Sequence, residues 1–189
     1  SQSGVNAVLV APQLAVDAAD SSAGRFWQTG GFAKFMGEAA QSLGKLHGGK
    51  NAVRAFTSMP IIIVSYSGGF QAAAYAIEKG GLKRRVRGLV LMDSLYGELD
   101  RFTAWLKSDP GAFLVSTYLG STQDHNAEFA RRLTAASISY GTELPPVLKP
   151  GSITIMPAGT DITHRDLMTT AWTASPVADL LRRLREYRH

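Results

Sequence analysis

The sequence contains no cysteine, and charged residues make up only 19% of its 189 positions. Without cysteine, disulfide scaffolds, cysteine-ligated zinc, iron–sulfur clusters and cysteine nucleophiles are excluded. No apolar run approaches the roughly 20 residues that a membrane-spanning helix needs, so we expect no membrane span. The hydrophobic fraction of 45% is that of a globular chain rather than a disordered one. The length and composition predict a single domain over residues 1–189.

The chain carries a formal charge of +5, and its basic residues cluster at 83–87 and 182–185. Such clusters can bind nucleic acids or anionic surfaces. Aromatic residues do not alternate with these arginines, although proteins that bind single-stranded nucleic acids use such aromatic side chains. We therefore interpret the clusters as a solvated helix face and a basic surface turn, and we expect no nucleic-acid partner.

Short apolar runs rich in β-branched residues alternate along the chain with segments of helical spacing. The apolar runs predict five strands, at Ala7–Val10, Ile61–Val64, Gly88–Met92, Phe113–Tyr118 and Ile153–Met156. Continuous apolarity is typical of strands that are buried on both faces of a parallel sheet. The predicted helices cover residues 32–43, 70–79, 99–106, 126–136 (with Asn126 as N-cap) and 176–185. This alternation predicts an α/β fold, with a mainly parallel sheet of about five strands flanked by helices in three layers.

The segment at residues 61–74 combines a buried strand, a tight turn of small residues and an Ala-rich helix. Residues 65–69 read Ser-Tyr-Ser-Gly-Gly, which matches the nucleophile-elbow pattern Gly-x-Ser-x-Gly except that Ser65 replaces the first glycine. In such an elbow the central serine occupies a strained position that exposes its hydroxyl group. Ser67 is therefore the candidate nucleophile. A phosphate-binding glycine turn and a purely structural turn are the alternatives.

A serine nucleophile needs a general base, and in elbow architectures the acid and then the histidine follow the serine along the chain. His164 follows the last predicted strand and is the candidate base, with His125 as the alternative. Asp93, at the end of an apolar strand, is the candidate acid, because an ionised group there needs a partner. Asp124 is the alternative acid, and the remaining alternatives are Asp161 or none of these aspartates.

The elbow, the strand-end Asp93 and His164 after the last strand together resemble the α/β-hydrolase superfamily of esterases, lipases, amidases and peptidases. The resemblance spans most of the chain. It implies a serine hydrolase, most readily a carboxylic ester hydrolase, that cleaves a small ester or amide through an acyl-enzyme. It also implies that Ser67 attacks the acyl carbonyl, His164 transfers the proton and Asp93 fixes the imidazole tautomer, with the backbone N–H of Gly68 as an oxyanion donor.

The chain departs from this family at its N-terminal end, where no His-Gly loop precedes Ala7 to supply a second oxyanion donor. If residues 7–10 are the family's fourth strand, the third strand, expected between them and the elbow strand, is missing. A gap of this kind would leave buried backbone groups unpaired. We therefore expect that upstream strands, from an N-terminal segment or another chain, complete the sheet. The alternative is a minimal five-stranded sheet in which residues 7–10 pair with residues 61–64.

Aromatic residues in the loops that follow the predicted strands are candidates for a substrate pocket. Tyr66, Tyr96 and Trp27 are the predicted substrate-binding residues. The pair Asp161 and His164 alone is a weak metal motif, so no metal and no organic cofactor is predicted. Two rival functions remain. One is a non-catalytic binding or scaffold module of the same fold, and the other is an anion-binding domain with basic residues around the 67–69 turn.

Overall fold

The structure is a computed structural model, and it describes residues 3–14 and 22–184. In these residues, four strands form one parallel sheet in the order β1-β2-β3-β4. Their bounds are β1 (Ile61–Tyr66), β2 (Val86–Met92), β3 (Phe113–Tyr118) and β4 (Ile153–Pro157). Because parallel neighbours need crossover connections, a helix lies between each strand and the next. All four carboxyl ends therefore lie at the same edge of the sheet.

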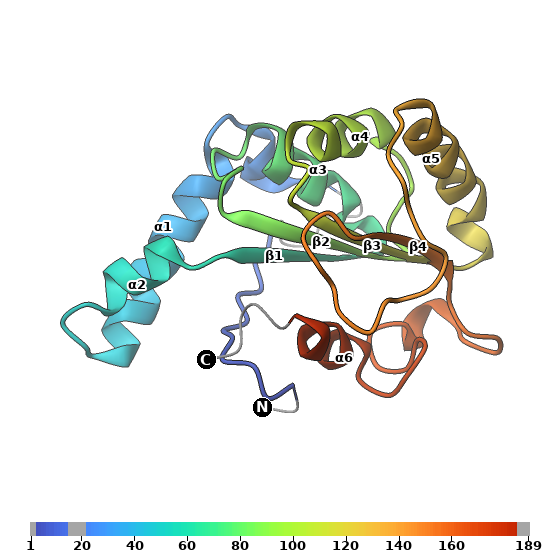
Figure 1. Cartoon of the computed structure of the whole chain (residues 1–189). Coiled ribbons are helices and arrows are strands. Elements are labelled where there is room, and N and C mark those ends of the chain that lie inside the picture. The colour runs from blue at the N-terminus through green and yellow to red at the C-terminus, as the bar shows by residue number, and fades with distance from the viewer. Residues whose placement is uncertain (1–2, 15–21, 185–189) are drawn as a thin grey trace.

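Helices cover both faces of this sheet. The α-helices are α1 (Gly31–His47), α2 (Ala52–Ser58), α3 (Phe70–Lys79), α4 (Leu99–Ser108), α5 (Gln123–Ala135) and α6 (Pro176–Arg183). The 3-10 turns are η1 (Gly24–Trp27), η2 (Ser67–Gly69), η3 (Gly120–Thr122) and η4 (His164–Asp166). Figure 1 shows α3, α4 and α5 on one face and α6 on the other. The predicted three-layer α/β class is confirmed. No helix in the described part of the chain is long and apolar enough to cross a membrane.

The apolar runs are continuous because each face of the sheet has its own hydrophobic core. Along β2, Leu89 and Leu91 pack with the helices of one face, whereas Val90 and Met92 pack in the second cluster with residues of α6. All four side chains are almost completely buried. Alternating side chains of a strand point to opposite faces, so a strand covered on both sides needs apolar residues at every position.

Close packing inside the sheet explains one glycine of β2. A Cβ atom added to Gly88 would lie 2.1 Å from the ring of Phe113 on β3. Gly88 and Phe113 are directly paired in the parallel register. The Phe113 ring therefore occupies the space that a side chain at residue 88 would need.

The prediction of a strand at Ala7–Val10 is wrong. Residues 6–14 form no helix or strand, and the side chain of Leu9 is 90% exposed. The described sheet therefore has four strands rather than about five, and the alternative in which residues 7–10 pair with β1 is also wrong. An apolar run of four residues becomes a strand only where a neighbouring edge accepts its backbone hydrogen bonds.

Helices α5 and α6 differ from their predicted bounds. Helix α5 begins at Gln123, three residues before the predicted start, so Asn126 is not an N-cap. The buried side chain of Asn126 accepts a hydrogen bond from Ser116 Oγ and donates one to the carbonyl oxygen of Thr122. The last helix begins at Pro176 as predicted, but it ends at Arg183, two residues before its predicted end, because Leu184 is not helical.

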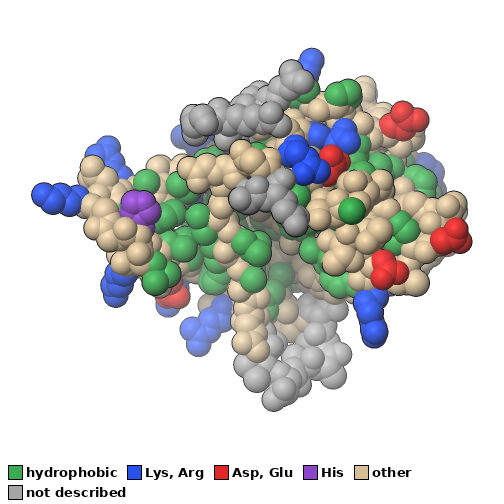
Figure 2. Space-filling view, turned by 90° about the horizontal axis from the view of Figure 1, so that it is seen from below, with side chains coloured by type: hydrophobic (Ala, Val, Ile, Leu, Met, Phe, Trp, Pro, Cys, Tyr) green, Lys and Arg blue, Asp and Glu red, His purple; other side chains and the backbone are tan. Residues whose placement is uncertain are grey.

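The two lateral edges of the sheet differ. At the β4 edge, the backbone of Gly141 donates to the carbonyl of Ile153 and accepts from the N–H of Ile155. Within the described residues, no strand pairs with the outer edge of β1. Val64 of β1 is 39% exposed, and Met59, just before this strand, is 40% exposed. Figure 2 shows hydrophobic side chains gathered on the face beside the projecting α1–α2 arm.

Candidate active site

Ser67 lies at the turn between β1 and α3, at the carboxyl edge of the sheet, and has a positive φ of 52°. A non-glycine residue in this left-handed region is strained, and such strain is common at functional sites. Two glycines follow Ser67 because β1 and α3 approach each other closely here. A Cβ atom added to Gly69 would lie 3.0 Å from Ser65 Oγ. Gly68, the predicted oxyanion donor, directly follows Ser67 in η2. The strand–turn–helix context that the motif requires is therefore present.

Ser65, which replaces the first glycine of the motif, takes part in a hydrogen-bond chain that supports the turn. Ser94 Oγ donates to the backbone carbonyl of Ser67 at 2.7 Å. Since the Ser94 hydroxyl has only one proton, the Ser65 hydroxyl must be the donor in its 2.6 Å contact with Ser94 Oγ. The chain therefore runs from Ser65 through Ser94 to the strained residue, and a glycine at position 65 could not form it.

Asp93 directly follows β2 and is completely buried, with a positive φ of 43°. Its carboxylate accepts a backbone hydrogen bond from Leu119 at 3.1 Å and side-chain hydrogen bonds from the hydroxyls of Ser121, at 2.8 Å, and Thr122. These donors belong to the segment after β3, the strand that pairs with β2. The topology of the sheet thus brings the ends of two neighbouring strands together around one carboxylate.

The hydrogen bonds around Asp93 decide its charge state. Burial acts to raise the pKa of the Asp93 carboxyl group, because it penalises the ionised form. Hydrogen bonds from Thr122, Ser121, Leu119 and His164 favour the ionised form and together outweigh burial, so the pKa lies below its usual value. Asp93 is therefore a carboxylate at neutral pH.

His164 begins the short turn η4, seven residues after the end of β4. Its Nδ1 atom lies 2.6 Å from Asp93 Oδ2. Because the carboxylate can only accept, Nδ1 carries the proton, and Nε2 of the neutral ring is an acceptor. No hydrogen bond within the described residues engages Nε2, and the side chain is 39% exposed. A ring held in this tautomer can accept a proton through Nε2.

Thr163 and Asp166 form the local turn that carries His164. The Asp166 carboxylate accepts from the backbone N–H and the hydroxyl of Thr163, and the backbone N–H of Asp166 pairs in return with the Thr163 side chain to form a capping box. Leu167, directly after the turn, is completely buried in the second core cluster. The turn is therefore closed by its own polar residues and anchored to the face of the sheet that α6 covers.

No described hydrogen bond or ion pair joins the alternative residues to His164 or to Asp93. Asp124 and His125 are exposed residues in the first turn of α5, and Asp161 is exposed in the loop after β4 with a positive φ of 63°. The acid that the structure brings to His164 is Asp93.

The three predicted substrate-binding residues have different surroundings. Tyr66 stacks on the His164 ring, with the ring centroids 4.8 Å apart. Tyr96 is half-buried, and its hydroxyl lies 3.5 Å from Ser121 Oγ, so it is next to the Asp93 cluster. Trp27 is 57% exposed and belongs to η1, which packs against α1 and α3. The described contacts join Tyr66 and Tyr96 to the site, and they do not include Trp27.

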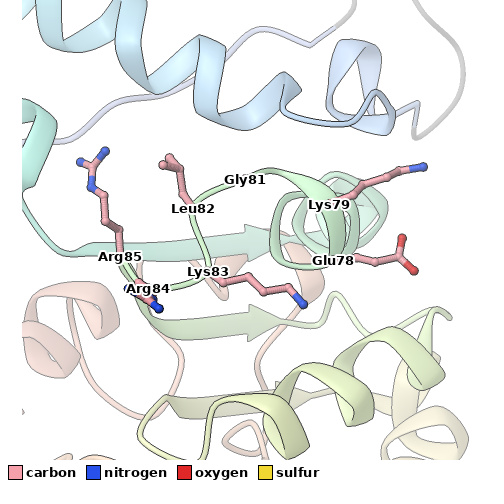
Figure 3. A pocket seen from close by; sticks show the side chains of 7 residues that line it. All are labelled: Glu78, Lys79, Gly81, Leu82, Lys83, Arg84 and Arg85. Carbon is pink, nitrogen blue, oxygen red and sulfur yellow. The ribbon is translucent and has the colours of Figure 1, made fainter.

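A second surface feature is a pocket of roughly 560 Å³ at the opposite end of α3. Seven residues line it: Glu78, Lys79, Gly81, Leu82, Lys83, Arg84 and Arg85 (Figure 3). Arg85 donates to the backbone carbonyls of Met59 and Phe56, so this cation helps to fix the segment between α2 and the start of β1. In Figure 3 the side chain of Arg85 points away from those of Lys79 and Lys83. The 67–69 turn precedes α3 at the end of β1, whereas the basic residues 83–85 follow α3 and precede β2. This basic cluster is therefore at the other end of α3 from the turn, contrary to what the anion-binding alternative expects.

Sequence reasoning missed the residues that hold Asp93 and the turn. Ser121 and Thr122 come just after the end of β3. In a parallel sheet this position lies beside the end of the neighbouring strand β2, so the sequence could have predicted that they lie near Asp93. The position of Ser94 next to Asp93 was a weaker indication of a role at the site, since serine is common after strands. The hydrogen bond from Ser94 to Ser67 depends on side-chain directions that the sequence does not specify.

No group of three or more His, Cys, Asp or Glu side chains suited to a metal ion occurs among residues 3–14 and 22–184. The chain was also compared with protein-family models, with curated proteins and with solved structures. None of the three comparisons found a match. The architecture that the structure shows is a three-layer α/β fold with a parallel sheet.

Proposed function

We propose that this protein is a serine hydrolase that cleaves a small ester or amide through an acyl-enzyme intermediate. The observation that carries the proposal is the 2.6 Å hydrogen bond between buried Asp93 and His164, at the sheet edge where Ser67 occupies a strained turn. An ionised carboxylate on Nδ1 leaves Nε2 as a base, and the strained serine directly follows the tyrosine that stacks on this imidazole. Nucleophilic catalysis by serine needs a serine, a base and a carboxylate that orients the base, and the described hydrogen bonds join the last two of these.

In the proposed reaction, Ser67 Oγ attacks the acyl carbon while Nε2 of His164 accepts the hydroxyl proton. The Asp93 carboxylate stabilises the imidazolium that forms and remains ionised. Collapse of the tetrahedral intermediate expels the alcohol or amine, which takes the proton from Nε2. Water then repeats the sequence on the acyl-enzyme, releases the acid and restores Ser67.

The oxyanion of the tetrahedral intermediate needs backbone donors. The N–H of Gly68 is the proposed first donor, because it belongs to the residue after the nucleophile. The second donor is proposed to come from a strand that pairs with the outer edge of β1, which no strand of the described residues occupies, and completes the sheet. Losing one oxyanion donor typically lowers turnover by 10²–10³, so the chain without such a strand is expected to react slowly with substrates and with covalent probes.

The test is covalent labelling with a fluorophosphonate probe at neutral pH, followed by peptide mass spectrometry. We expect one phosphonylated serine, Ser67, and no labelling of Ser67→Ala. The matched control is Ser108→Ala, which removes a hydroxyl at the exposed end of α4 and should label as the original chain does. Because slow labelling is expected, the reaction is followed for hours.

Two results would contradict the proposal. One is a folded chain that stays unmodified over this period, and the other is labelling that survives Ser67→Ala. The first result would favour the non-catalytic binding or scaffold module instead.

A further inference from the structure

The side chain of Tyr66 makes two different contacts with His164. Its hydroxyl donates a hydrogen bond of 2.9 Å to the backbone carbonyl oxygen of His164. Its ring stacks on the imidazole at an interplanar angle of 24°. The two residues are 98 positions apart in the chain, so these contacts join the end of β1 to the turn η4.

These contacts restrict motions of the imidazole that Asp93 leaves free. The bond between Nδ1 and Asp93 fixes one ring nitrogen, but the ring can still pivot about that axis and move Nε2 sideways. A second ring stacked on its face opposes the pivot, because tilting would lose the contact between the faces. The hydrogen bond to the carbonyl oxygen fixes the backbone that carries the ring. Together, the three contacts restrict both the position and the plane of the imidazole.

We propose that Tyr66 is a positioning residue that holds the imidazole of His164 in the plane required for proton transfer with Ser67. This inference rests on the proposed function and deepens it. Tyr66 precedes Ser67 directly, so a single peptide unit links the residue that orients the base to the nucleophile. The role differs from the predicted one, in which Tyr66 lines a substrate pocket, because the ring face is used by His164.

The experiment compares Tyr66→Phe and Tyr66→Leu. Phenylalanine keeps the stacked ring and removes the hydroxyl, whereas leucine removes both contacts and retains apolar volume. The control is Tyr140→Phe, which removes the hydroxyl of an exposed tyrosine, 37% accessible, outside the site. The rate of fluorophosphonate labelling is measured against probe concentration, so that the maximal rate constant and the half-saturating concentration are obtained separately.

A positioning role predicts that the maximal rate constant falls and the half-saturating concentration does not change. Loss of one hydrogen bond should reduce the rate about tenfold in Tyr66→Phe. Loss of the stacking as well should reduce it about a hundredfold in Tyr66→Leu. A pocket-lining role would instead raise the half-saturating concentration, and that result would overturn the proposal.

A second measurement does not depend on reactivity. The Cε1–H proton resonance of His164, assigned by its loss in His164→Gln, should be shifted upfield by the ring current of Tyr66. The shift should persist in Tyr66→Phe and disappear in Tyr66→Leu. An unchanged resonance in Tyr66→Leu would overturn the positioning role. If the original chain resists the probe while the resonance behaves as expected, the proposed function fails and the structural contact stands.

Discussion

Asp93 is buried and Asp179 is partly buried. Each accepts a hydrogen bond from an aromatic N–H group, but their other partners differ. Asp179 on α6 accepts from Trp172 Nε1 and from Arg183 Nε, both at 2.9 Å. Arg183 also donates to the carbonyl of Pro145, so this cluster joins α6 to the loop that precedes β4. Asp93 instead accepts from neutral donors and from the imidazole of His164.

The difference indicates two purposes that the same side chain can serve, one structural and one in the proposed reaction. Burial acts to raise the pKa of both carboxyl groups, and in both cases interactions with neighbouring groups outweigh burial and lower the pKa. Around Asp179, arginine charges also lower the pKa, so the cluster is neutralised by permanent cations. Around Asp93, the partners are uncharged donors and an imidazole that can gain a proton. Asp179 is suited to anchor a helix, and Asp93 is suited to stabilise a charge that appears during a reaction.

The sharpest test of this comparison exchanges each carboxylate for an amide. Asp93→Asn should reduce the rate of Ser67 labelling by about 10⁴-fold, because the amide favours the wrong imidazole tautomer. Asp179→Asn should leave the rate unchanged. The rates are measured with the fluorophosphonate probe on chains shown to be folded by circular dichroism. Equal losses in the two variants would remove the distinction between the two sites.

Asp179→Asn should instead lower the free energy of unfolding, by about 2 kcal/mol, because Arg183 loses its carboxylate partner within a partly buried cluster. Urea unfolding at pH 7 measures this change. Glu143→Gln, in an exposed loop, is the control and should change the free energy by less than about 0.5 kcal/mol. An Asp179→Asn variant as stable as the original chain would contradict the anchoring role.

Acidification should remove the stabilisation that Asp179 provides. The folded-state pKa of this carboxyl group is lowered, so its contribution is complete above the unfolded-state pKa of about 3.9 and is lost as the pH falls through the folded-state value. The difference in unfolding free energy between the original chain and Asp179→Asn should be constant from pH 7 to about 5 and should shrink below about 4. Urea titrations at four pH values between 7 and 3 test this sign, and a difference that grows on acidification would contradict it.

The smallest expected effect concerns the hydrogen-bond chain under the turn. Ser94→Ala removes the donor to the Ser67 carbonyl and should slow labelling about tenfold, with a loss of about 1 kcal/mol in unfolding free energy. Ser58→Ala, at the exposed end of α2, is the matched control. A Ser94→Ala chain that labels at the original rate would show that the turn holds Ser67 without this support.

Local sequence patterns predicted much of the fold. The helix at Phe70–Lys79 has the predicted bounds, and the four runs that became strands were all identified. A continuous apolar run indicates a strand buried on both faces, and burial is nearly complete in β2 and β3. The run at residues 7–10 has the same local pattern, but no strand forms there. Strand formation also requires a partner for backbone hydrogen bonds, and a run of four residues carries no information about one.

The sequence by itself determined the class of fold, the small-residue turn at Ser67 and the kinds of residues that could act with it. Only the tertiary structure decided that Asp93, rather than Asp124, contacts His164, and that the ring of Tyr66 lies against this imidazole. The physical reason is that spacing along the chain fixes helices and strands through interactions between near neighbours. Contacts between residues about 70 to 100 positions apart depend instead on how strand ends, side-chain rotamers and loop turns meet at one edge of the sheet.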